Sequence, residues 1–435
     1  EARAIGVHVN FAPVADVNNN ARNPVINTRS FGEDPQRVAA LAVAYARGLR
    51  EGGALATVKH FPGHGDTDVD SHLGLPVITH PRERLDAMEL VPFRAAIADG
   101  VDALMTGHIE LPAFDPTPGT PATLSRPTVT GFLRDELKYE GLVYTDSMMM
   151  DAVSKMMTPA ESAVRAVKAG NDFVLHSPND AEAFTAVKAA VEAGEIDRAQ
   201  VDQSVRRILR AKARLGLHRS RVVDLNAVTS LVGGRAHQAV ADQVSQRAIT
   251  LIKDDRGHVP LQVPREANVL YLSVLDYPSG WAIAAPSRTF APELRKRWPK
   301  VTAVELSDRS TPSELDLVRA TAPRYDAIVV SVFVRAASSS GRMDLAPPVT
   351  RLLQDLARGS AARQVPMVAT LFGNPYVASV LSELPAVMLT YDFYDRAEMS
   401  AVKALAGEAP IGGRLPIALP GLFPVGHGLQ RAALQ

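Results

Sequence analysis

Short apolar segments alternate with amphipathic segments of helical period through the first half of the chain. Parallel strands need a long crossover connection, which a helix usually supplies. The alternation therefore predicts a parallel sheet with helices packed outside it. The predicted strands are residues 8–17, 54–60, 102–108, 141–146 and 172–176, and the predicted helices are Asp34–Glu51, Pro81–Ala98, Pro127–Tyr139, Pro159–Ala169 and a pair within Asp180–Leu215.

Polar side chains end each of the first four predicted strands. In a (β/α) barrel the carboxyl ends of consecutive strands form one active face, whereas a doubly wound sheet places its ligand at a single switch point. The pattern therefore favours a (β/α)8 barrel of the TIM type. Only five of its eight strands are recognisable, so either the sheet is open or about three strand–helix units are missing before Glu1. The side chains are, strand by strand, Asp16 and Asn18, Lys59 and His60, His108, and Asp146.

A second alternation of strands and helices follows a connector that contains glycine. We predict a barrel domain at residues 1–217, a linker at 218–240 and a second α/β domain at 241–435. The chain is long enough to form two separate cores. The strands predicted in the second domain are Ala248–Lys253, Val269–Leu275, Ala327–Phe333, Met367–Phe372, Ala386–Tyr391 and Leu415–Ala418, and the helices are 291–298, 312–321, 348–358 and 396–406.

The composition excludes several classes of protein. Lysine plus arginine equals aspartate plus glutamate, at 47 each, so charge gives no reason to expect a nucleic-acid or anionic-membrane partner. No apolar stretch approaches the roughly 18 residues of a membrane-spanning helix. The absence of cysteine excludes disulfides, thiolate metal sites and cysteine nucleophiles. No pattern indicates an oligomeric state.

One segment concentrates titratable side chains, because residues 59–72 read KHFPGHGDTDVDSH. Its glycines and proline interrupt helix and strand alike, which predicts a loop after a buried strand. One interpretation is a zinc-dependent hydrolase, since imidazole and carboxylate bind zinc, although the spacing matches no helix-borne metal motif. The metal ligands would be His60, His64, Asp66 and His72.

The second interpretation takes Asp70 and His72 as a catalytic dyad. An aspartate two residues from a histidine can accept one imidazole proton and fix the tautomer. The other ring nitrogen can then act as a general acid and afterwards as a base. In the structural alternative, His64 bonds the loop backbone, and Asp66 and Asp68 are turn residues.

Asp146 follows a strongly apolar strand in LVYTDSMMMDAV. A carboxylate at this rim position is partly desolvated, as a covalent nucleophile or general base requires. The alternative is an N-cap that begins the next helix. Met148, Met149 and Met150 are more typical of packing residues or of a pocket wall than of reactive groups.

Four further side chains are candidates for substrate contact. Lys59 and His60 end a strand, where a buried lysine needs a partner such as a carboxylate or a polyhydroxylated ligand. Arg29, in NTRSFGEDP, either clamps a ligand oxygen or pairs with a neighbouring carboxylate. His108 has the same strand-end location, and either contacts ligand or makes a structural hydrogen bond.

Together these motifs resemble glycoside hydrolase family 3, in its β-N-acetylhexosaminidase branch. The resemblance rests on KHFPGHGDTDVDSH followed by GLP, NFAPVADVN, INTRSFGEDP, MTGHIELPAFD and YTDSMMMDA, and it spans essentially the first 217 residues. Two less specific segments, AITLIKDDRGHVPL and GGRLPIALPGLFPVGHGL, resemble the opening and closing segments of the α/β sandwich domain in two-domain members.

The resemblance implies a retaining exo-β-N-acetylglucosaminidase without metal or cofactor, acting on cell-wall or chitin-derived saccharides. It implies a TIM-type barrel followed by an α/β sandwich. Asp146 would be the nucleophile, and His72, polarised by Asp70, the general acid/base. We expect a bacterial protein, secreted or periplasmic rather than cytoplasmic. The residues implied to hold the N-acetylglucosamine ring are Lys59, His60 and Arg29.

Several alternatives stay open within the resemblance. The β-glucosidases of the family generally take an acid/base glutamate from the second domain, and the corresponding loop 335–344 (RAASSSGRMD) has none, which is consistent with the dyad. Phosphate in place of water would make a phosphorylase. Family barrels also carry an upstream Asp-x-Glu-Gly-Gly strand that would lie before Glu1, so a silent sugar-binding protein is a further alternative.

Overall fold

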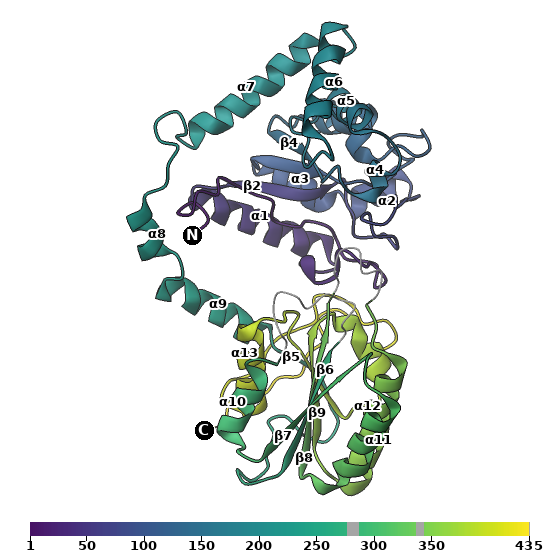
Figure 1. Cartoon of the computed structure of the whole chain (residues 1–435), viewed down its shortest axis with the longest axis vertical. Helices are drawn as coiled ribbons and strands as arrows, with labels where there is room; N and C mark the ends of the chain where they lie inside the picture. Colours follow the sequence, from purple (N-terminus) through teal and green to yellow (C-terminus); the bar gives the residue numbers. More distant parts are fainter. Residues whose placement is uncertain (276–286, 336–342, 435) are drawn as a thin grey trace. The chain divides into compact units, whose positions relative to one another are not determined.

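The computed structural model of the chain describes residues 1–275, 287–335 and 343–434. These residues divide into two compact units, Glu1–Gly234 and Arg235–Gln435. Figure 1 shows helices α8 (Leu225–Leu231) and α9 (Arg235–Ala248) where the sequence suggests a linker. Part of the segment 218–240 is therefore helical.

The first unit is built on a four-stranded parallel sheet with the strands in chain order. The first predicted strand is interrupted, because β1 covers only Val9–Asn10 and Val14 makes a separate bridge to Lys59. Pro13, which has no N–H to donate, stands between the two pairings. The other strands are β2 (Leu55–Phe61), β3 (Ala103–Thr106) and β4 (Leu142–Thr145).

The fifth predicted strand, residues 172–176, forms a single bridge between Phe173 and Tyr144. The N–H of Leu175 donates to the side-chain Oγ1 of Thr145 at 2.8 Å instead of to a backbone carbonyl, so the ladder does not continue. A pattern of apolar residues does not reveal such competition from a side chain.

Helices cover one face of this sheet and form the core of the first unit. Phe61 and Phe93 are fully buried there and pack edge to face, with ring centroids 5.6 Å apart. Helices α1 (Pro35–Glu51) and α3 (Val91–Ala98) contribute to the same core. Asp34 caps α1 with its side chain, as the residue type at that position favours.

The single helix predicted over Pro81–Ala98 is two helices, α2 (Arg82–Ala87) and α3. Met88 leaves the helical conformation, with φ −131° and ψ −78°. Pro92 then stands in the first turn of α3, where a missing N–H does no harm. The apolar stripe continues across the break, so periodicity alone did not reveal it.

The rest of the first unit follows the prediction more closely. Helix α5 has the predicted bounds, and the predicted pair of helices is α6 and α7. Within the described residues, no helix is both long and apolar enough to cross a bilayer. The elements are a π-helix at Pro127–Glu136, α4 (Asp151–Ser154), α5 (Pro159–Ala169), α6 (Asp180–Glu192) and α7 (Arg198–Arg214).

The second unit contains a six-stranded sheet and helices on both of its faces. Its strands are β5 (Thr250–Asp254), β6 (Val269–Leu275), β7 (Val301–Ser307), β8 (Ala327–Val334), β9 (Met367–Gly373) and β10 (Ala386–Leu389). Its α-helices, after α9, are α10 (Phe290–Arg297), α11 (Pro312–Thr321), α12 (Pro347–Arg363) and α13 (Asp395–Leu405).

The strands of the second unit lie in the order β5-β10-β9-β8-β6-β7, with β5 antiparallel to β10 and the other neighbours parallel. Figure 1 shows α10 and α13 over one face and α11 and α12 over the other. The sequence pattern does not predict β7, because its middle residues are exposed at the sheet edge. The predicted strand Leu415–Ala418 is wrong, since Pro416 removes a ladder donor from it.

The parallel sheet of the first unit positions the site. Because all four strands run in one direction, their carboxyl ends meet at one edge. His60 lies at that end of β2, and His108 and Asp146 follow β3 and β4. The predicted site residues therefore share one edge of the sheet.

A buried aspartate fastens α7 to this sheet. The carboxylate of Asp172, 1% exposed, accepts from Nη2 of Arg134 at 2.8 Å and from Nη1 of Arg207 at 3.2 Å. It also accepts from the N–H of Val143 at 2.8 Å and from the hydroxyl of Ser204 at 2.6 Å. Since Ser204 and Arg207 belong to α7, one carboxylate holds the helix against β4.

We expect Asp172→Ala to destabilise the first unit strongly. Two partly buried guanidinium groups would lose their partner, and such losses cost about 3 to 5 kcal/mol. Urea unfolding followed by circular dichroism measures the change. The control is Asp202→Ala, an exposed position on the same helix, which should change the free energy of unfolding by less than about 0.5 kcal/mol. Equal midpoints for the two variants would contradict the assigned role of Asp172.

Candidate active site

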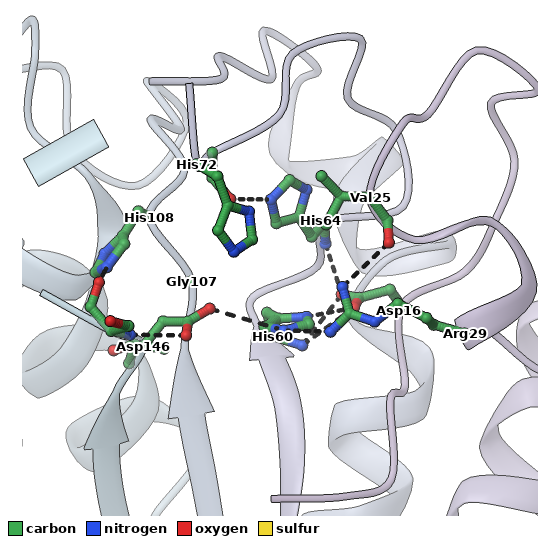
Figure 2. A network of polar contacts seen from close by, with 12 residues as sticks. Asp16, Val25, Arg29, His60, His64, His72, Gly107, His108 and Asp146 are labelled. Carbon is green, nitrogen blue, oxygen red and sulfur yellow. Dashed lines mark hydrogen bonds and ion pairs between the residues drawn. The ribbon is translucent and has the colours of Figure 1, made fainter. Parts of the chain in front are cut away.

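The carboxyl edge of the first sheet gathers the predicted site residues. Figure 2 shows His60, His72, His108 and Asp146 around a common space, with Arg29 beside His60. The pairing of β2 with β3 shifts register between Lys59 and Phe61, at the point where these side chains leave the strand. Such an irregularity re-aims side chains at a sheet edge.

A wholly buried carboxylate, Asp16, organises the inner side of the site. It accepts from Nδ1 of His60 at 2.7 Å and from the backbone N–H of His64 at 2.7 Å. Burial opposes its ionisation, but the charge and hydrogen bonds of His60, with His64, hold the pKa of Asp16 below its ordinary value. Asp16 lies at a predicted strand end in NFAPVADVN, and that position was the signal for a role that the sequence alone did not assign.

Asp146 stands at the end of β4 with its side chain 19% exposed. Its Oδ1 accepts the N–H of Ser147 at 2.7 Å, and its Oδ2 lies 3.7 Å from Nε2 of His60. Burial raises its pKa, yet the nearby His60 and His108 outweigh this effect, so the net pKa of Asp146 lies below its ordinary value. The helix-cap alternative is wrong, because α4 begins five residues later and Met150 is its N-cap.

Asp70 and His72 form the pair that the sequence suggests. The Oδ1 of Asp70 accepts from Nδ1 of His72 at 2.7 Å and from its backbone N–H at 2.8 Å. The Asp70 side chain is 1% exposed and that of His72 is 29% exposed. Within the described part of the chain, nothing hydrogen-bonds to Nε2 of His72, so this nitrogen is available to a substrate.

His108 is held between two protein groups. Its Nε2 lies 2.9 Å from the carbonyl oxygen of Ser147, and its Nδ1 lies 2.9 Å from Oγ1 of Thr123. A carbonyl only accepts, so Nε2 carries the proton. Burial lowers the pKa of His108, which keeps the ring neutral. The predicted contact of His108 with substrate stays a prediction, while the structure gives the ring a role in holding Ser147 behind Asp146.

Lys59 and Arg29 place two cationic groups beside His60 and Asp146. Burial, and then repulsion from Arg29, lower the pKa of Lys59 from its ordinary 10.5. No hydrogen bond or ion pair to the Lys59 ammonium occurs among the described residues. Arg29 donates to the carbonyl of Val25 at 3.1 Å, and its Nη2 lies 3.4 Å from Nε2 of His60. These groups can hold the oxygens of a polar ligand.

The four residues of the zinc interpretation do not converge. In each of them at least one ring nitrogen or carboxylate oxygen is engaged by a protein group that is not one of the other three residues. Over the described ranges, no group of three or more histidine, aspartate or glutamate side chains is arranged to hold a metal. Their partners are Asp16 for His60, Thr67 and Ser71 for His64, His80 for Asp66, and Asp70 for His72.

Comparison with known proteins identifies the family. Residues 1–211 match the Glycosyl hydrolase family 3 N terminal domain. The Beta-N-acetylglucosaminidase/beta-glucosidase of Cellulomonas fimi is 31% identical over 433 residues, which cover 96% of this chain and 75% of that protein. The chain belongs to glycoside hydrolase family 3. The family assignment and the prediction of a glycoside hydrolase are thus confirmed.

Solved structures of the family confirm the fold class. A family 3 beta-N-acetylglucosaminidase from Paenibacillus sp. str. FPU-7 superposes with a TM-score of 0.85 and 34% identity, over 96% of this chain and 77% of that one. A beta-glucoside phosphorylase gives a TM-score of 0.85 at 25% identity, over 97% of this chain and 76% of its own. Most of the loop 335–344, compared above with the glutamate loop of β-glucosidases, lies outside the described residues.

The buried His64 generates a pH-dependent contribution to stability. Burial, and then repulsion from His60, lower the pKa of His64 from 6.5 to about 4. Between these two pH values the unfolded chain binds a proton that the folded chain does not, so this contribution is lost as the pH falls from about 6.5 to about 4.

We expect this group to remove up to about 3 kcal/mol of stability across that window. In His64→Gln, whose amide does not titrate, the free energy of unfolding should fall less steeply. Urea unfolding of both proteins at several pH values between 7 and about 4 makes the comparison. Parallel curves would contradict the lowered pKa.

Proposed function

We propose that this family 3 enzyme is a retaining exo-β-N-acetylglucosaminidase. It removes terminal β-linked N-acetylglucosamine from peptidoglycan-derived or chitin-derived saccharides. The Asp70–His72 hydrogen bond of 2.7 Å carries the proposal, because it supplies an acid/base group beside the ionised Asp146. The names of the Cellulomonas and Paenibacillus relatives support the choice of sugar.

In the first step Asp146 attacks the anomeric carbon. The neighbouring groups that lower its pKa, with His60 first among them, keep the carboxylate ionised, as a nucleophile requires. Ser147 takes up Oδ1 through its N–H, and Oδ2 is left to form the bond to carbon. The bond to the leaving oxygen breaks as this bond forms. The imidazolium form of His72 gives its Nε2 proton to that oxygen and becomes a neutral imidazole whose Nδ1–H stays on Asp70.

In the second step water attacks the anomeric carbon of the glycosyl-enzyme, the bond from that carbon to Asp146 breaks, and the Asp146 carboxylate is restored. Nε2 of His72 now accepts the proton of the water, while the carboxylate of Asp70 retains its hydrogen bond to Nδ1. Retaining enzymes of this class usually use two carboxyl groups about 5 to 5.5 Å apart. Here the imidazole replaces the second carboxyl group and avoids a further negative charge beside Asp146.

The side chains around Asp146 form the sugar subsite in this proposal. Lys59, His60 and Arg29 offer donors to the ring hydroxyls and the N-acetyl oxygen. The low pKa of Lys59 reflects a partly desolvated ammonium, whose energy a polar ligand would improve. His108 acts through Ser147 and does not itself need to touch the sugar.

The test is hydrolysis of 4-nitrophenyl N-acetyl-β-glucosaminide by the wild type, Asp146→Ala and His72→Ala. We expect Asp146→Ala to be inactive, since no covalent intermediate can form. His72→Ala should lower kcat by about 10²-fold or more, as removal of a general acid/base does. The 4-nitrophenyl β-glucoside should be turned over less well than the N-acetyl substrate. Undiminished turnover by His72→Ala, or preference for the glucoside, would overturn the proposal.

A second candidate function is a β-N-acetylglucosaminide phosphorylase, in which phosphate replaces water. The similarity to a beta-glucoside phosphorylase favours considering it, and a histidine repels an incoming phosphate less than a carboxylate would.

Added inorganic phosphate distinguishes the two functions. A hydrolase should release N-acetylglucosamine at a rate that phosphate leaves unchanged, and this is the result we expect. Accumulation of N-acetylglucosamine 1-phosphate, detected by mass spectrometry, with a rate that rises with phosphate, would instead establish the phosphorylase.

A further inference from the structure

The side chain of His64 makes hydrogen bonds across the loop that carries Asp70 and His72. Its Nδ1 lies 2.8 Å from Oγ1 of Thr67, and its Nε2 lies 3.1 Å from Oγ of Ser71. All three residues are buried, at 2% exposure each. Figure 2 shows His64 beside His72. The imidazole therefore joins Thr67 to Ser71, the residue between Asp70 and His72.

The hydrogen bonds fix the direction of each donor. The carbonyl oxygen of His64 lies 3.2 Å from the Thr67 hydroxyl. Because a carbonyl only accepts, the Thr67 hydroxyl donates its hydrogen bond to it. The Thr67 oxygen then accepts from Nδ1–H of His64 and from the amide of Asn23 at 3.3 Å. Nε2 keeps a lone pair, and the Ser71 hydroxyl donates to it. The low pKa of His64, about 4, agrees with a neutral ring.

The backbone of Ser71 makes a further hydrogen bond. Its carbonyl accepts the N–H of Ala152 at 3.3 Å, in the helix that follows Asp146 in the chain. The two neighbours of Ser71 are the two members of the dyad. A displacement of Ser71 therefore moves the dyad relative to Asp146.

We propose that His64 and Ser71 are positioning residues for the acid/base dyad. Their hydrogen bond holds the loop so that Nε2 of His72 faces the leaving oxygen. Proton transfer falls steeply when a catalytic group is misplaced by about 1 Å, so the loss of one such bond is measurable. This inference rests on the proposed role of His72.

Two substitutions of His64 separate the effects of its two hydrogen bonds, to Thr67 and to Ser71. In His64→Gln the amide oxygen reaches the position of Nε2 and can still accept from Ser71. In His64→Asn the shorter amide reaches only the position of Nδ1, so the bond to Thr67 is kept and the bond to Ser71 is lost. Ser71→Ala removes the same bond from the other side.

The readout is the dependence on the leaving group. Phenyl N-acetyl-β-glucosaminide needs a proton from the acid, whereas the 2,4-dinitrophenyl glycoside needs little help. We expect Ser71→Ala and His64→Asn to lower kcat for the phenyl substrate about tenfold, and for the dinitrophenyl substrate less than about twofold. His64→Gln should stay within about threefold of wild type on both substrates.

The control is Ser154→Ala, which removes a hydroxyl that donates to the carbonyl of Met149 at 3.1 Å. This hydroxyl takes no part in the hydrogen bonds of His64 or Ser71. It should leave both rates unchanged. Equal losses on the two substrates in Ser71→Ala and His64→Asn, with a selective loss in His72→Ala, would overturn this inference alone. Failure of His72→Ala to show the selective loss would overturn the proposed function as well. Thermal midpoints identify any variant that does not fold, and the remaining variants still decide the question.

Discussion

The buried carboxylate of Asp16 is the interaction on which the arrangement of the site depends. It accepts from Nδ1 of His60 at 2.7 Å and from the N–H of His64 at 2.7 Å, so it joins the end of β2 to the loop that carries Asp70 and His72. A carboxylate removed from water is stable only with such partners. The orientation of His60 and the path of the loop are therefore fixed together, because a change in either removes a hydrogen bond from the buried Asp16.

The site contains two aspartate–histidine pairs that have the same hydrogen-bond length and differ in burial. The Nδ1–carboxylate distance is 2.7 Å in both, but the His60 side chain is 5% exposed and that of His72 is 29% exposed. The buried pair holds its imidazole beside Asp146, whereas the partly exposed imidazole of the other pair can exchange a proton with a bound molecule. In the proposed mechanism the same chemical motif thus gives support in one place and proton transfer in the other, since burial and not composition sets the role.

Local signals in the sequence predicted much of the fold. The apolar runs of β2, β3, β4 and β6 stand out because their residues are buried on both faces. The exposed edge strand β7 lacks that signal. Leu175 is apolar, yet its N–H pairs with a threonine side chain. Among the site residues, Asp70, His72 and Asp146 belong to specific motifs, whereas the importance of Asp16 depends on contacts that no local pattern contains.

The sequence by itself determined the alternation of strands and helices, the family, and the candidate residues at the strand ends, because periodicity and motifs are properties of neighbouring residues. Only the tertiary structure decided which group each candidate bonds. Asp16 meets His60 from 44 positions away, and Ser147 meets His108 from 39 positions away. A hydrogen bond acts over about 3 Å, so its partners are known only when the strands have brought distant segments to one edge.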